Sequence, residues 1–547
     1  MWNPDFAVEP DPRRRAVGTL YEPKDCTNPK IGTTQMTAQV PATEPSSPDT
    51  EVAKAHNPNV AIIQGFIGSL MMLAGSLGVG WLSLASYDLR RNPVIMWLRF
   101  EPEGSVLAVF LLALGGMLLV RSWLRLGQRI TSWGPESRPV VLKAIIAWGA
   151  PMCVALPLFS RDVFAYIAQG LVMVSGLNPY KDGYSQISNY LQTGADDLWA
   201  QSPTPYGPVF LWLEELVIRI TDGQPEFSIL LFRLISLVGV AMCVYYVPKL
   251  AELHNINPNR ALWLTAANPL FLTTFIASIH NDALMIGLAL GGLYLAATKR
   301  ALPGILLITL SIGIKPITLI LLPFAGLMWA GKGASWPRKF LYWFLTAGIS
   351  LGLLWIMGIA NGFGFGWVGA LSTPGSVWIW YAPVGFLGML VATLGNALGL
   401  PGWTFADIVH TVGRVVSVLI VFWQMFVGEY SRLVRRLALA FAAVVLLAPM
   451  IQSWYVVWLI PLFAVTGIRN DWQVKTLYLL VSFFMVYAIS DQLDIWPYFD
   501  FSLSAARQIA AVTALGFALY LIFLDPKTKV LFRKRLTEPS PGELRTR

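Results

Sequence analysis

The sequence predicts an all-α polytopic membrane protein with about 14 transmembrane helices, within a range of about 12–16. Three observations support this fold class. Of the 547 residues, 55% are hydrophobic and only 13% are charged, and the mean hydropathy is +0.57. Apolar runs of roughly 17–25 residues, the length that spans about 30 Å of hydrocarbon, recur along most of the chain. The lysines and arginines fall between these runs in a one-sided pattern, which is typical of integral membrane proteins.

The apolar runs divide the chain into four regions. Residues 1–59 are rich in proline and show no apolar periodicity, so we expect a disordered cytoplasmic tail. A first transmembrane module covers residues 60–360 and includes a polar outer loop at 160–227. A second module covers residues 361–524 and begins with an outer aromatic loop, and residues 525–547 form a basic cytoplasmic tail. The expected spans are 60–86, 105–124, 140–159, 228–248, 261–279, 283–298, 301–313, 316–331, 340–360, 408–428, 437–450, 454–468, 474–490 and 504–524.

Basic residues indicate which side of the membrane each loop faces. With the N-terminus in the cytoplasm, the main clusters of lysine and arginine fall on the cytoplasmic side, as the positive-inside rule requires. We therefore expect a plasma-membrane protein with both termini in the cytoplasm. The clusters are Arg121/Arg125/Arg129/Arg138, Lys249/Arg260, Lys299/Arg300, Lys332/Arg338/Lys339, Arg432/Arg435/Arg436, Arg469/Lys475 and Lys527 through Arg535.

Two further apolar segments, Gly207–Ile220 and Gly385–Leu400, are not expected to cross. If both crossed, the loops between them would turn outward against the positive-inside rule. The first segment also contains Glu214, Glu215 and Arg219, which a spanning helix would have to bury. Both segments are predicted as juxtamembrane helices at the outer interface. The outer face then receives polar and aromatic groups from widely separated parts of the chain.

One carboxylate stands where an apolar run ends. Asp162 follows the run 144–159, and an ionisable residue that close to hydrocarbon costs roughly 2.5–3.5 kcal/mol, so it usually marks a functional site. It begins a predicted amphipathic helix, Asp162–Val174, with Tyr166 one turn further on the same face. A carboxylate in this place can act as a general base. An ordinary interfacial aspartate or a helix N-cap also accounts for it.

Two rigid turns follow that helix. Gly176-Leu-Asn-Pro-Tyr180 supplies a glycine stop and a proline that prevents the helix from continuing. Ser202-Pro-Thr-Pro-Tyr206-Gly-Pro208 fixes the backbone before the next helix and presents Tyr206 at the interface. A plain connector between a loop and a helix also explains the second turn.

His280, Asn281 and Asp282 form a polar turn between the spans 261–279 and 283–298. These side chains can contact a substrate hydroxyl or support residues that do. Two potential metal ligands adjacent in sequence are weak evidence for a metal site. A capped start of the next helix, at Asn281 or Asp282, is the alternative explanation.

Charged and aromatic residues complete the outer-side set. Lys315 lies where the positive-inside rule would not place a lysine, and its ammonium can hold a phosphate or extend toward lipid headgroups. Arg507, at the outer start of the last span, is a second candidate phosphate ligand. Trp454 and Tyr455 open an outer-side span, where they can stack on a sugar or anchor the helix in the interface. No motif of a nucleotide-driven pump, dehydrogenase, zinc protease or serine hydrolase is present.

In combination, these motifs resemble the membrane glycosyltransferases of the GT-C superfamily. More narrowly, their order and sidedness are similar to those of the actinobacterial polyprenyl-phosphomannose-dependent α-1,6-mannosyltransferases of the MptA/MptB type. The resemblance covers residues 60–524 and implies a GT-C-like fold, with the catalytic part in the first module. The segments that carry it are Ser160-Arg-Asp162-Val-Phe-Ala-Tyr166, Gly176-Leu-Asn-Pro-Tyr180, Thr204-Pro-Tyr-Gly-Pro208, His280-Asn-Asp282, Ile314-Lys315-Pro316 and Ser453-Trp454-Tyr455.

The resemblance implies an inverting transfer of mannose at the outer membrane face, in lipomannan and lipoarabinomannan biosynthesis. The donor would be polyprenyl-phosphate-mannose and the acceptor a lipid-anchored α-1,6-mannan. Asp162 would take the proton of the attacking hydroxyl, and Lys315 and Arg507 would stabilise the leaving phosphate. No cofactor is implied, while a divalent metal and the oligomeric state are left open. The implied substrate-binding residues are Tyr166, Tyr180, Tyr206, His280, Asp282, Trp454 and Tyr455.

Several alternatives stay open at this point. Many members of the superfamily carry the catalytic aspartate after the first span, where this sequence has Asp88. Asp88 lacks the downstream tyrosine and the Gly-Leu-Asn-Pro-Tyr turn, so Asp162 is preferred. The main competing function is a transporter or flippase of a lipid-linked sugar, for which we would expect internal repeats and ionisable groups at mid-depth. A non-catalytic membrane scaffold is the third possibility.

Overall fold

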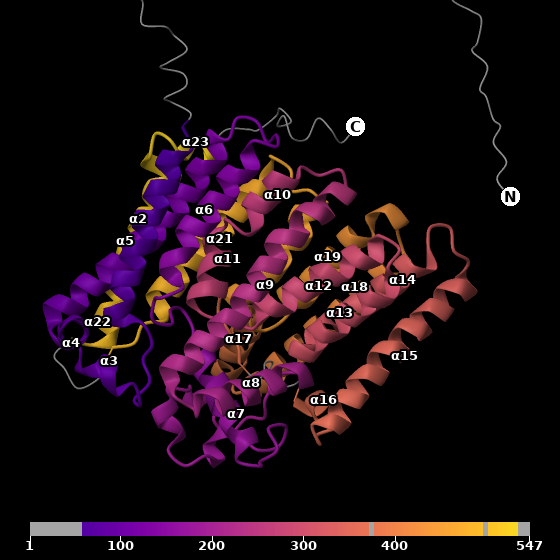
Figure 1. Cartoon of the computed structure of the whole chain (residues 1–547), viewed down its shortest axis with the longest axis horizontal. Helices are drawn as coiled ribbons and strands as arrows, with labels where there is room; N and C mark the ends of the chain where they lie inside the picture. Colours follow the sequence, from indigo (N-terminus) through magenta and orange to yellow (C-terminus); the bar gives the residue numbers. More distant parts are fainter. Residues whose placement is uncertain (1–56, 371–376, 496–500, 534–547) are drawn as a thin grey trace, which may run out of the picture. The chain divides into compact units, whose positions relative to one another are not determined.

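The computed structural model describes residues 57–370, 377–495 and 501–533, so the predicted disordered tail at 1–59 lies almost entirely outside the described residues. Within these ranges the regular secondary structure is entirely helical (Figure 1). The longer helices are α2 (Asn59–Val79), α5 (Pro102–Arg129), α6 (Ser137–Met152), α7 (Asp162–Val174), α8 (Pro208–Thr221), α9 (Pro225–Leu253), α10 (Pro258–Thr265), α12 (Asp282–Ala297), α13 (Ala301–Ile314), α14 (Leu322–Ala330), α15 (Trp336–Ala360), α17 (Pro383–Ala397), α18 (Gly402–Phe426), α19 (Leu433–Leu446), α20 (Ser453–Thr466), α21 (Trp472–Asp491) and α22 (Leu503–Leu519). Shorter elements are α3 (Tyr87–Arg91), α4 (Pro93–Phe100), α11 (Pro269–Leu272) with the π-helical turn η4 (Thr273–Ala277), the 3-10 turn η5 (Pro316–Leu321), α16 (Gly366–Ala370), the π-helical turn η8 (Tyr520–Leu524) and α23 (Lys529–Arg533).

The first helices form one closely packed group. α2 runs along α5, and α6 and α22 pack around this pair. A Cβ at Gly68 of α2 would lie 2.7 Å from the carbonyl oxygen of Gly115 of α5, so only glycine permits this approach. At the start of the predicted C-terminal tail (525–547), Asp525 accepts a hydrogen bond from Arg121 of α5 at 2.8 Å. The first part of that tail is therefore fixed to the helices.

A second group of helices surrounds α9 and contains a break. α12 packs against both α9 and α13, and α20 contacts α9 and α10. The predicted span 261–279 is divided into α10, α11 and η4. The helix that ends with η4 and the helix α12 meet at an angle of 117°. The break falls at residues 278–281, where the sequence predicts a polar turn.

The number of membrane crossings is consistent with a polytopic protein. In the described part of the chain, seven helices are long and apolar enough to cross a membrane, and counting the bent pair as one span gives eight. Each remaining predicted span coincides with a shorter helix or with short helices in succession. The described part of the chain is therefore all-helical, and its apolar helices are those of a polytopic membrane protein, as the composition predicts.

The first helix of the 160–227 loop has the predicted bounds. α7 begins at Asp162 and is followed by Gly176, whose φ of 77° lies in the left-handed region. The N–H of Leu177 donates to the carbonyl of Val172 at 3.1 Å, which completes a Schellman motif. The glycine stop predicted from the sequence is confirmed.

The second helix of this loop, α8, packs against α7. The two backbones meet at Gly170, where a Cβ would lie 2.8 Å from the carbonyl oxygen of Glu214. Of the three charged residues of α8, Glu215 and Arg219 form an ion pair near solvent, with 26% and 60% of their side chains exposed. Glu214 is fully buried, and this burial raises the pKa of its carboxyl well above the usual range. Burial therefore favours the uncharged form of Glu214.

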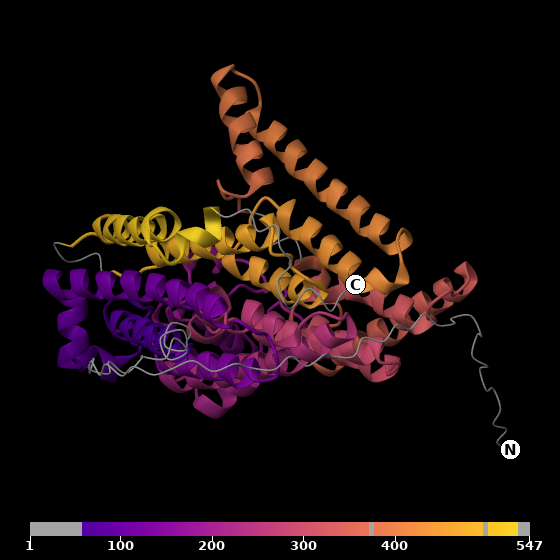
Figure 2. The same ribbon diagram turned by 90° about the horizontal axis from the view of Figure 1, so that it is seen from above.

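The helices α17 and α18 form an antiparallel hairpin, drawn in orange in Figure 2, that stands away from its neighbours. α17 coincides with the predicted juxtamembrane segment Gly385–Leu400. Large apolar side chains of α18 such as Ile408, Val412 and Leu419 are exposed. Such a surface is suited to contact with lipid rather than with water.

The basic clusters and the break lie at opposite ends of the helices. α7 and α8 are at the lower end in Figure 1, and α23 is at the upper end. α12 begins at the break and ends just before Lys299 and Arg300, and α13 returns from there to Lys315. α19 leads away from Arg432, and α20 leads back to Arg469. Lys315 thus lies at the end of the helices where α7 lies, opposite to the basic clusters.

Candidate active site

Asp162 stands at the break between α6 and α7. The connecting segment ends at Phe159, whose φ of 64° is in the left-handed region that bulky residues rarely adopt. The hydroxyl of Ser160 then accepts a hydrogen bond from the N–H of Asp162 at 3.1 Å, and Arg161 occupies the N-cap position. Asp162 is therefore the first residue of α7 and not its N-cap. Its side chain is 28% exposed.

Arg161 fixes the polar loop against this break. Its guanidinium donates to the carbonyl of Gly194 at 2.8 Å and to that of Ala195 at 2.9 Å. The guanidinium also lies 4.6 Å from the centre of the Trp81 ring, a cation–π distance. Arg161 is consequently a structural neighbour of Asp162, and its charge is directed away into the loop.

Asp282 stands at a second break of the same kind, between η4 and α12. Ile279 has a φ of 61°, and Asp282 is the first residue of α12. Asn281 occupies the N-cap position but makes no capping hydrogen bond, so the capping explanation for this motif is wrong. The N–H of Leu158 donates to the carbonyl of Ala277 at 3.2 Å, so the two breaks lie side by side.

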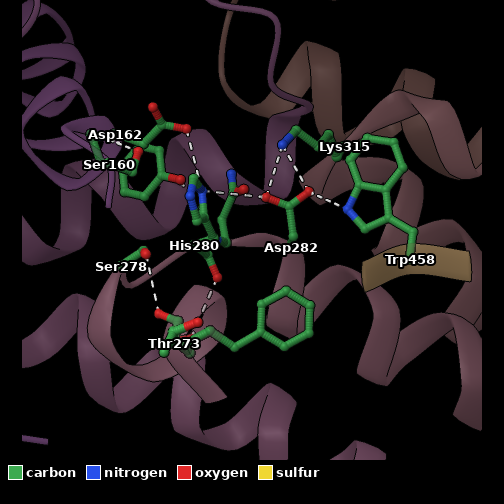
Figure 3. Close-up of polar contacts among 12 residues, drawn as sticks. Ser160, Asp162, Thr273, Ser278, His280, Asp282, Lys315 and Trp458 are labelled. Atoms are coloured by element: carbon green, nitrogen blue, oxygen red, sulfur yellow. Dashed lines mark hydrogen bonds and ion pairs between the residues drawn. The ribbon is translucent and has the colours of Figure 1, made fainter. Parts of the chain in front are cut away.

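His280 lies between the two aspartates, and Lys315 binds Asp282 (Figure 3). The ammonium of Lys315 donates to both carboxylate oxygens of Asp282, at 2.8 and 2.9 Å, and the indole N–H of Trp458 donates to the same carboxylate at 2.7 Å. Nδ1 of His280 lies 3.3 Å from Asp162 and 3.7 Å from Asp282. Four of the charged or titratable residues singled out in the sequence thus form one continuous cluster.

A cavity of about 560 Å³ opens beside this cluster, within the range usual for small-molecule sites. Asp162 and Lys315 provide its charged part, and Tyr206, Trp454 and Tyr455 provide aromatic faces. η5 and the end of α19 provide an apolar wall. The other residues of the lining are Ala165, Gln169, Trp199, Ser202, Pro203, Pro205, Pro316, Ile317, Leu319, Val444, Val445, Ala448, Pro449, Met450, Gln452 and Trp458.

The predicted tyrosines support the cavity from behind and from its edge. Tyr166 is fully buried, its hydroxyl accepts a long hydrogen bond of 3.4 Å from the N–H of Asn281, and its ring meets that of Tyr206 edge to face at 5.5 Å. The hydroxyl of Tyr180 donates to the carbonyl of Tyr206 at 3.0 Å. Burial raises the pKa of Tyr166 and of Tyr206 well above the usual range, so both stay neutral. Of Tyr166, Tyr180 and Tyr206, only Tyr206 lines the cavity.

Electrostatics keep Asp162 in its ionised form. Burial alone would raise the pKa of this carboxyl, but the nearby His280 and Lys315 and the Ser160 hydroxyl outweigh it and lower the pKa below the usual range. Asp162 is therefore a carboxylate at neutral pH and can accept a proton or a hydrogen bond from a group in the cavity.

The structure does not bring every predicted residue to the cavity. Arg507 is not in the lining, and its guanidinium lies 3.9 Å from Asp491, with 45% of its side chain exposed. Asp88 lies in α3, a short helix between α2 and α4. Among the described residues, no group of three or more His, Cys, Asp or Glu side chains could hold a metal ion.

Trp458 is the functional candidate that the sequence reasoning missed. It lies one turn after Trp454 on α20, so both side chains project from the same helix face. Trp454 packs against His280 with its ring tilted and the ring centres 4.2 Å apart, and the indole N–H of Trp458 donates to Asp282. The four-residue spacing of two tryptophans after a predicted outer-side turn is the signal that could have found it.

Comparison with known proteins identifies the family of the chain. Residues 62–331 match the family model described as alpha-(1->6)-mannopyranosyltransferase, N-terminal domain, and residues 384–519 match the MptB C-terminal domain. The chain is 30% identical over 407 residues to alpha-(1->6)-mannopyranosyltransferase A of Mycobacterium tuberculosis, covering 72% of this chain and 78% of the relative. The chain belongs to the alpha-(1->6)-mannopyranosyltransferase family. A probable alpha-(1->6)-mannopyranosyltransferase of Mycolicibacterium smegmatis is 28% identical over 493 residues, covering 83% of this chain and 87% of that protein. No solved structure matches the chain.

Membership of the alpha-(1->6)-mannopyranosyltransferase family makes the protein a glycosyltransferase and decides against the transporter and the scaffold. The two matched domains share the cavity unequally. The first contributes both charged residues of the lining, Asp162 and Lys315. The second contributes aromatic and apolar residues, and its Trp458 reaches across to Asp282 of the first. The site therefore exists only where the two domains meet.

Proposed function

We propose that this mannosyltransferase transfers mannose, with inversion, from polyprenyl-phosphate-mannose to a lipid-anchored α-1,6-mannan, as in lipomannan and lipoarabinomannan biosynthesis. The reaction takes place at the outer face of the plasma membrane, with Asp162 as the general base. The relatives are named for α-1,6-mannosyl transfer, and the expected donor and acceptor follow from the resemblance of the motifs.

The observation that carries the proposal is the composition of the cavity. It joins a carboxylate, Asp162, to an ammonium, Lys315, and continues into the apolar wall formed by η5 and the end of α19. A sugar linked through phosphate to a long hydrocarbon chain needs these three environments in this order. A nucleotide sugar would instead need polar surroundings for its base and ribose.

The proposed step forms one bond and breaks another. A hydroxyl of the acceptor attacks the anomeric carbon of mannose, its proton passes to the carboxylate of Asp162, and the electron pair of the breaking C–O bond goes to the lipid phosphate. An ammonium has three donor hydrogens. Because Lys315 directs two of them to Asp282, the third is available to the phosphate. General-base assistance is typically worth about 10²–10⁴ in rate.

The aromatic residues of the lining suit the sugar. Tyr206, Trp454 and Tyr455 present ring faces and edges to the cavity, and such faces pack on the apolar side of a pyranose. Tyr166, Tyr180, His280 and Asp282, which were also predicted to bind substrate, are then supports of these residues. Arg507 stays a prediction for the phosphate that the geometry does not favour, because its guanidinium lies beside Asp491.

The outer location rests on the positive-inside rule. Basic clusters such as Lys299/Arg300 lie at the helix ends opposite to Asp162, which supports cytoplasmic termini and an outward cavity. If the shorter helices cross in succession, the count reaches the expected figure of about 14. A lipid-carried donor is consistent with an active site on the side where nucleotide sugars are absent.

A transfer assay with the purified protein tests the proposal. Radiolabelled mannose is offered as polyprenyl-phosphate-mannose with an α-1,6-dimannoside acceptor, and Asp162→Asn is compared with wild type. We expect kcat to fall by about 10²–10⁴ in Asp162→Asn. Asp222→Asn is the matched control, because Asp222 is exposed at the end of α8, in a left-handed conformation that asparagine tolerates. Wild-type protein that transfers nothing to a mannoside, or an active Asp162→Asn variant, would contradict the proposal.

A further inference from the structure

His280 is a buried imidazole to which the proposed reaction gives no direct part. Its side chain is 1% exposed, and it is absent from the cavity lining. Trp454 covers it, with ring centres 4.2 Å apart and the planes inclined by 34°. A sugar in the cavity would meet Trp454 first, so any effect of His280 on the reaction must pass through a neighbouring residue.

The neighbours of His280 determine whether its Nδ1 carries a hydrogen. Nδ1 lies 3.3 Å from a carboxylate oxygen of Asp162 and 3.7 Å from one of Asp282. A lone pair on Nδ1 would be repelled by both oxygens, whereas an N–H attracts them. The two carboxylate oxygens therefore favour a hydrogen on Nδ1 over a lone pair.

The two carboxylates differ in how many other hydrogen-bond donors they have. Asp282 is fully buried and already accepts hydrogen bonds from Lys315 and Trp458 at 2.7 to 2.9 Å. Asp162 accepts neither of these hydrogen bonds. Nδ1 of His280 lies 3.3 Å from its Oδ2 and makes no hydrogen bond of regular geometry to any group, so it is free to turn toward Asp162. The imidazole N–H thus serves Asp162 most, and Asp282 keeps the ring in place from the other side.

We propose that His280 is a positioning residue for Asp162. The Nδ1–H of His280 holds one carboxylate oxygen of Asp162, so that the other oxygen faces the acceptor hydroxyl. The inference rests on the proposed role of Asp162 as the base. It assigns His280 no contact with sugar or phosphate. Of the two roles that the sequence left open, it favours the support of a reacting residue over the substrate binding that the resemblance implied.

The pH profile distinguishes this role from a structural one. The groups that face His280 and Asp162 are Asp282 of α12, Lys315 beside η5, Tyr166 of α7, Tyr206 and Tyr455, together with Tyr184 of the polar loop, which interacts with Asp162. His280 is one of the groups that lower the pKa of Asp162. A base works only when it is deprotonated, so activity is lost as the pH falls through that pKa. Without His280 the pKa rises, and the acid limb of the kcat profile moves to higher pH.

Two substitutions separate the hydrogen bond from the bulk of the ring. His280→Leu removes the donor, and His280→Asn restores an N–H close to the position of Nδ1. A hydrogen bond to a charged group is worth about 1.5–3 kcal/mol, so kcat should fall about 10–100-fold in His280→Leu. The acid limb should rise by about 1 pH unit, the donor KM should stay within about twofold, and His280→Asn should recover most of kcat. An unshifted acid limb in His280→Leu, or a His280→Asn variant no better than His280→Leu, would overturn the proposal.

A spectroscopic readout tests the geometry independently of turnover. The chain has four histidines, so ¹⁵N-histidine labelling in lipid nanodiscs gives few signals, and His280→Asn assigns the one of interest. We expect a protonated Nδ1 for His280 at neutral pH, with its resonance shifted in Asp162→Asn. An unprotonated Nδ1 contradicts the inference even if transfer is observed. His254→Asn, at the end of α9, is the control and should change neither kcat nor the acid limb. If wild type shows no transfer, the proposed function fails while this measurement still decides the position of the proton.

Discussion

The breaks that carry Asp162 and Asp282 have the same local architecture and different surroundings. Each follows a helix that stops, passes through a residue with positive φ three positions earlier, Phe159 or Ile279, and places its aspartate first in the next helix. Yet Asp162 is 28% exposed and faces the cavity, whereas Asp282 is fully buried between an ammonium and an indole.

The comparison shows that the backbone geometry of the break places a carboxylate at the start of the next helix. The side chains around that carboxylate then determine whether it is held in an ion pair or is available to a substrate. Asp282, with its charge matched by Lys315, is fixed and cannot reach a ligand. Asp162 keeps an oxygen for the cavity because His280 is its one close cationic or N–H partner among the described side chains. One aspartate therefore organises the site, and the other is available to react.

The largest effect is expected from breaking the charge pair behind the cavity. Asp282→Asn leaves the ammonium of Lys315 without its carboxylate, and removing one partner of a buried pair costs about 3–5 kcal/mol of stability. Chemical unfolding in mixed micelles measures this. Asp162→Asn, which alters a partly exposed side chain, should change the free energy of unfolding by less than about 1 kcal/mol.

A double substitution sharpens this test. Lys315→Met alone should destabilise by a similar amount, and Asp282→Asn with Lys315→Met should cost clearly less than the sum of the two. Additive costs would mean that the pair does not act as a unit. Equal losses of stability in Asp162→Asn and Asp282→Asn would remove the distinction between the two breaks.

Arg233 of α9 connects both breaks, so its loss should affect them together. The buried guanidinium donates to the carbonyls of Cys153 and Ala155 on the side of Asp162, at 2.8 and 2.7 Å, and to that of Ile276 on the side of Asp282, at 3.3 Å. In Arg233→Met these acceptors lose their donor, and we expect a loss of about 3 kcal/mol.

Activity and stability should fall together in Arg233→Met, unlike in Asp162→Asn. Arg219→Met is the control: that arginine is 60% exposed and pairs only within its own helix, so its removal should cost less than about 0.5 kcal/mol. A fully stable Arg233→Met protein would show that the two breaks hold their positions without it.

The smallest effect on stability is expected at the residue with positive φ that lies three positions before each aspartate. At Ile279 and Phe159, the glycine variant should be more stable than the alanine variant by about 1 kcal/mol, because alanine is strained at positive φ. The order should reverse at Ala283 inside α12, where glycine is expected to cost about 1 kcal/mol. Thermal unfolding of the paired variants measures both differences. Alanine variants as stable as the glycine variants would mean that neither break stores strain.

The sequence predicted the local features of the fold well. Each expected span has a helical counterpart, α7 has the predicted bounds, and Gly176 ends it. These features depend on apolar length and on turn residues that act within a few positions. The division of 261–279 into three pieces was not predicted, because Pro269 and the π-helical turn η4 lie within a mainly apolar run that is long enough to be one span.

The candidate site was predicted as a set of residues but not as a network. Asp162, Tyr206, Lys315 and Trp454 do share one cavity. That Lys315 binds Asp282, and that Trp458 does so too, depends on contacts between residues 33 and 176 positions apart in the sequence. Such contacts depend on how the helices pack, and the pattern of residues along one sequence does not predict helix packing. For the same reason Arg507 was predicted at the site and lies beside another acid instead.

The division of the cavity between two matched domains has a consequence for how such enzymes diversify. Twelve of the lining residues lie in the first domain and nine in the second, and both charges belong to the first. Exchanging the second domain between relatives would rebuild the walls that touch chain and sugar while leaving the reacting groups in place. Recombination can therefore change substrate selectivity without changing the reacting groups, as long as the exchanged second domain keeps a tryptophan whose indole N–H donates to Asp282.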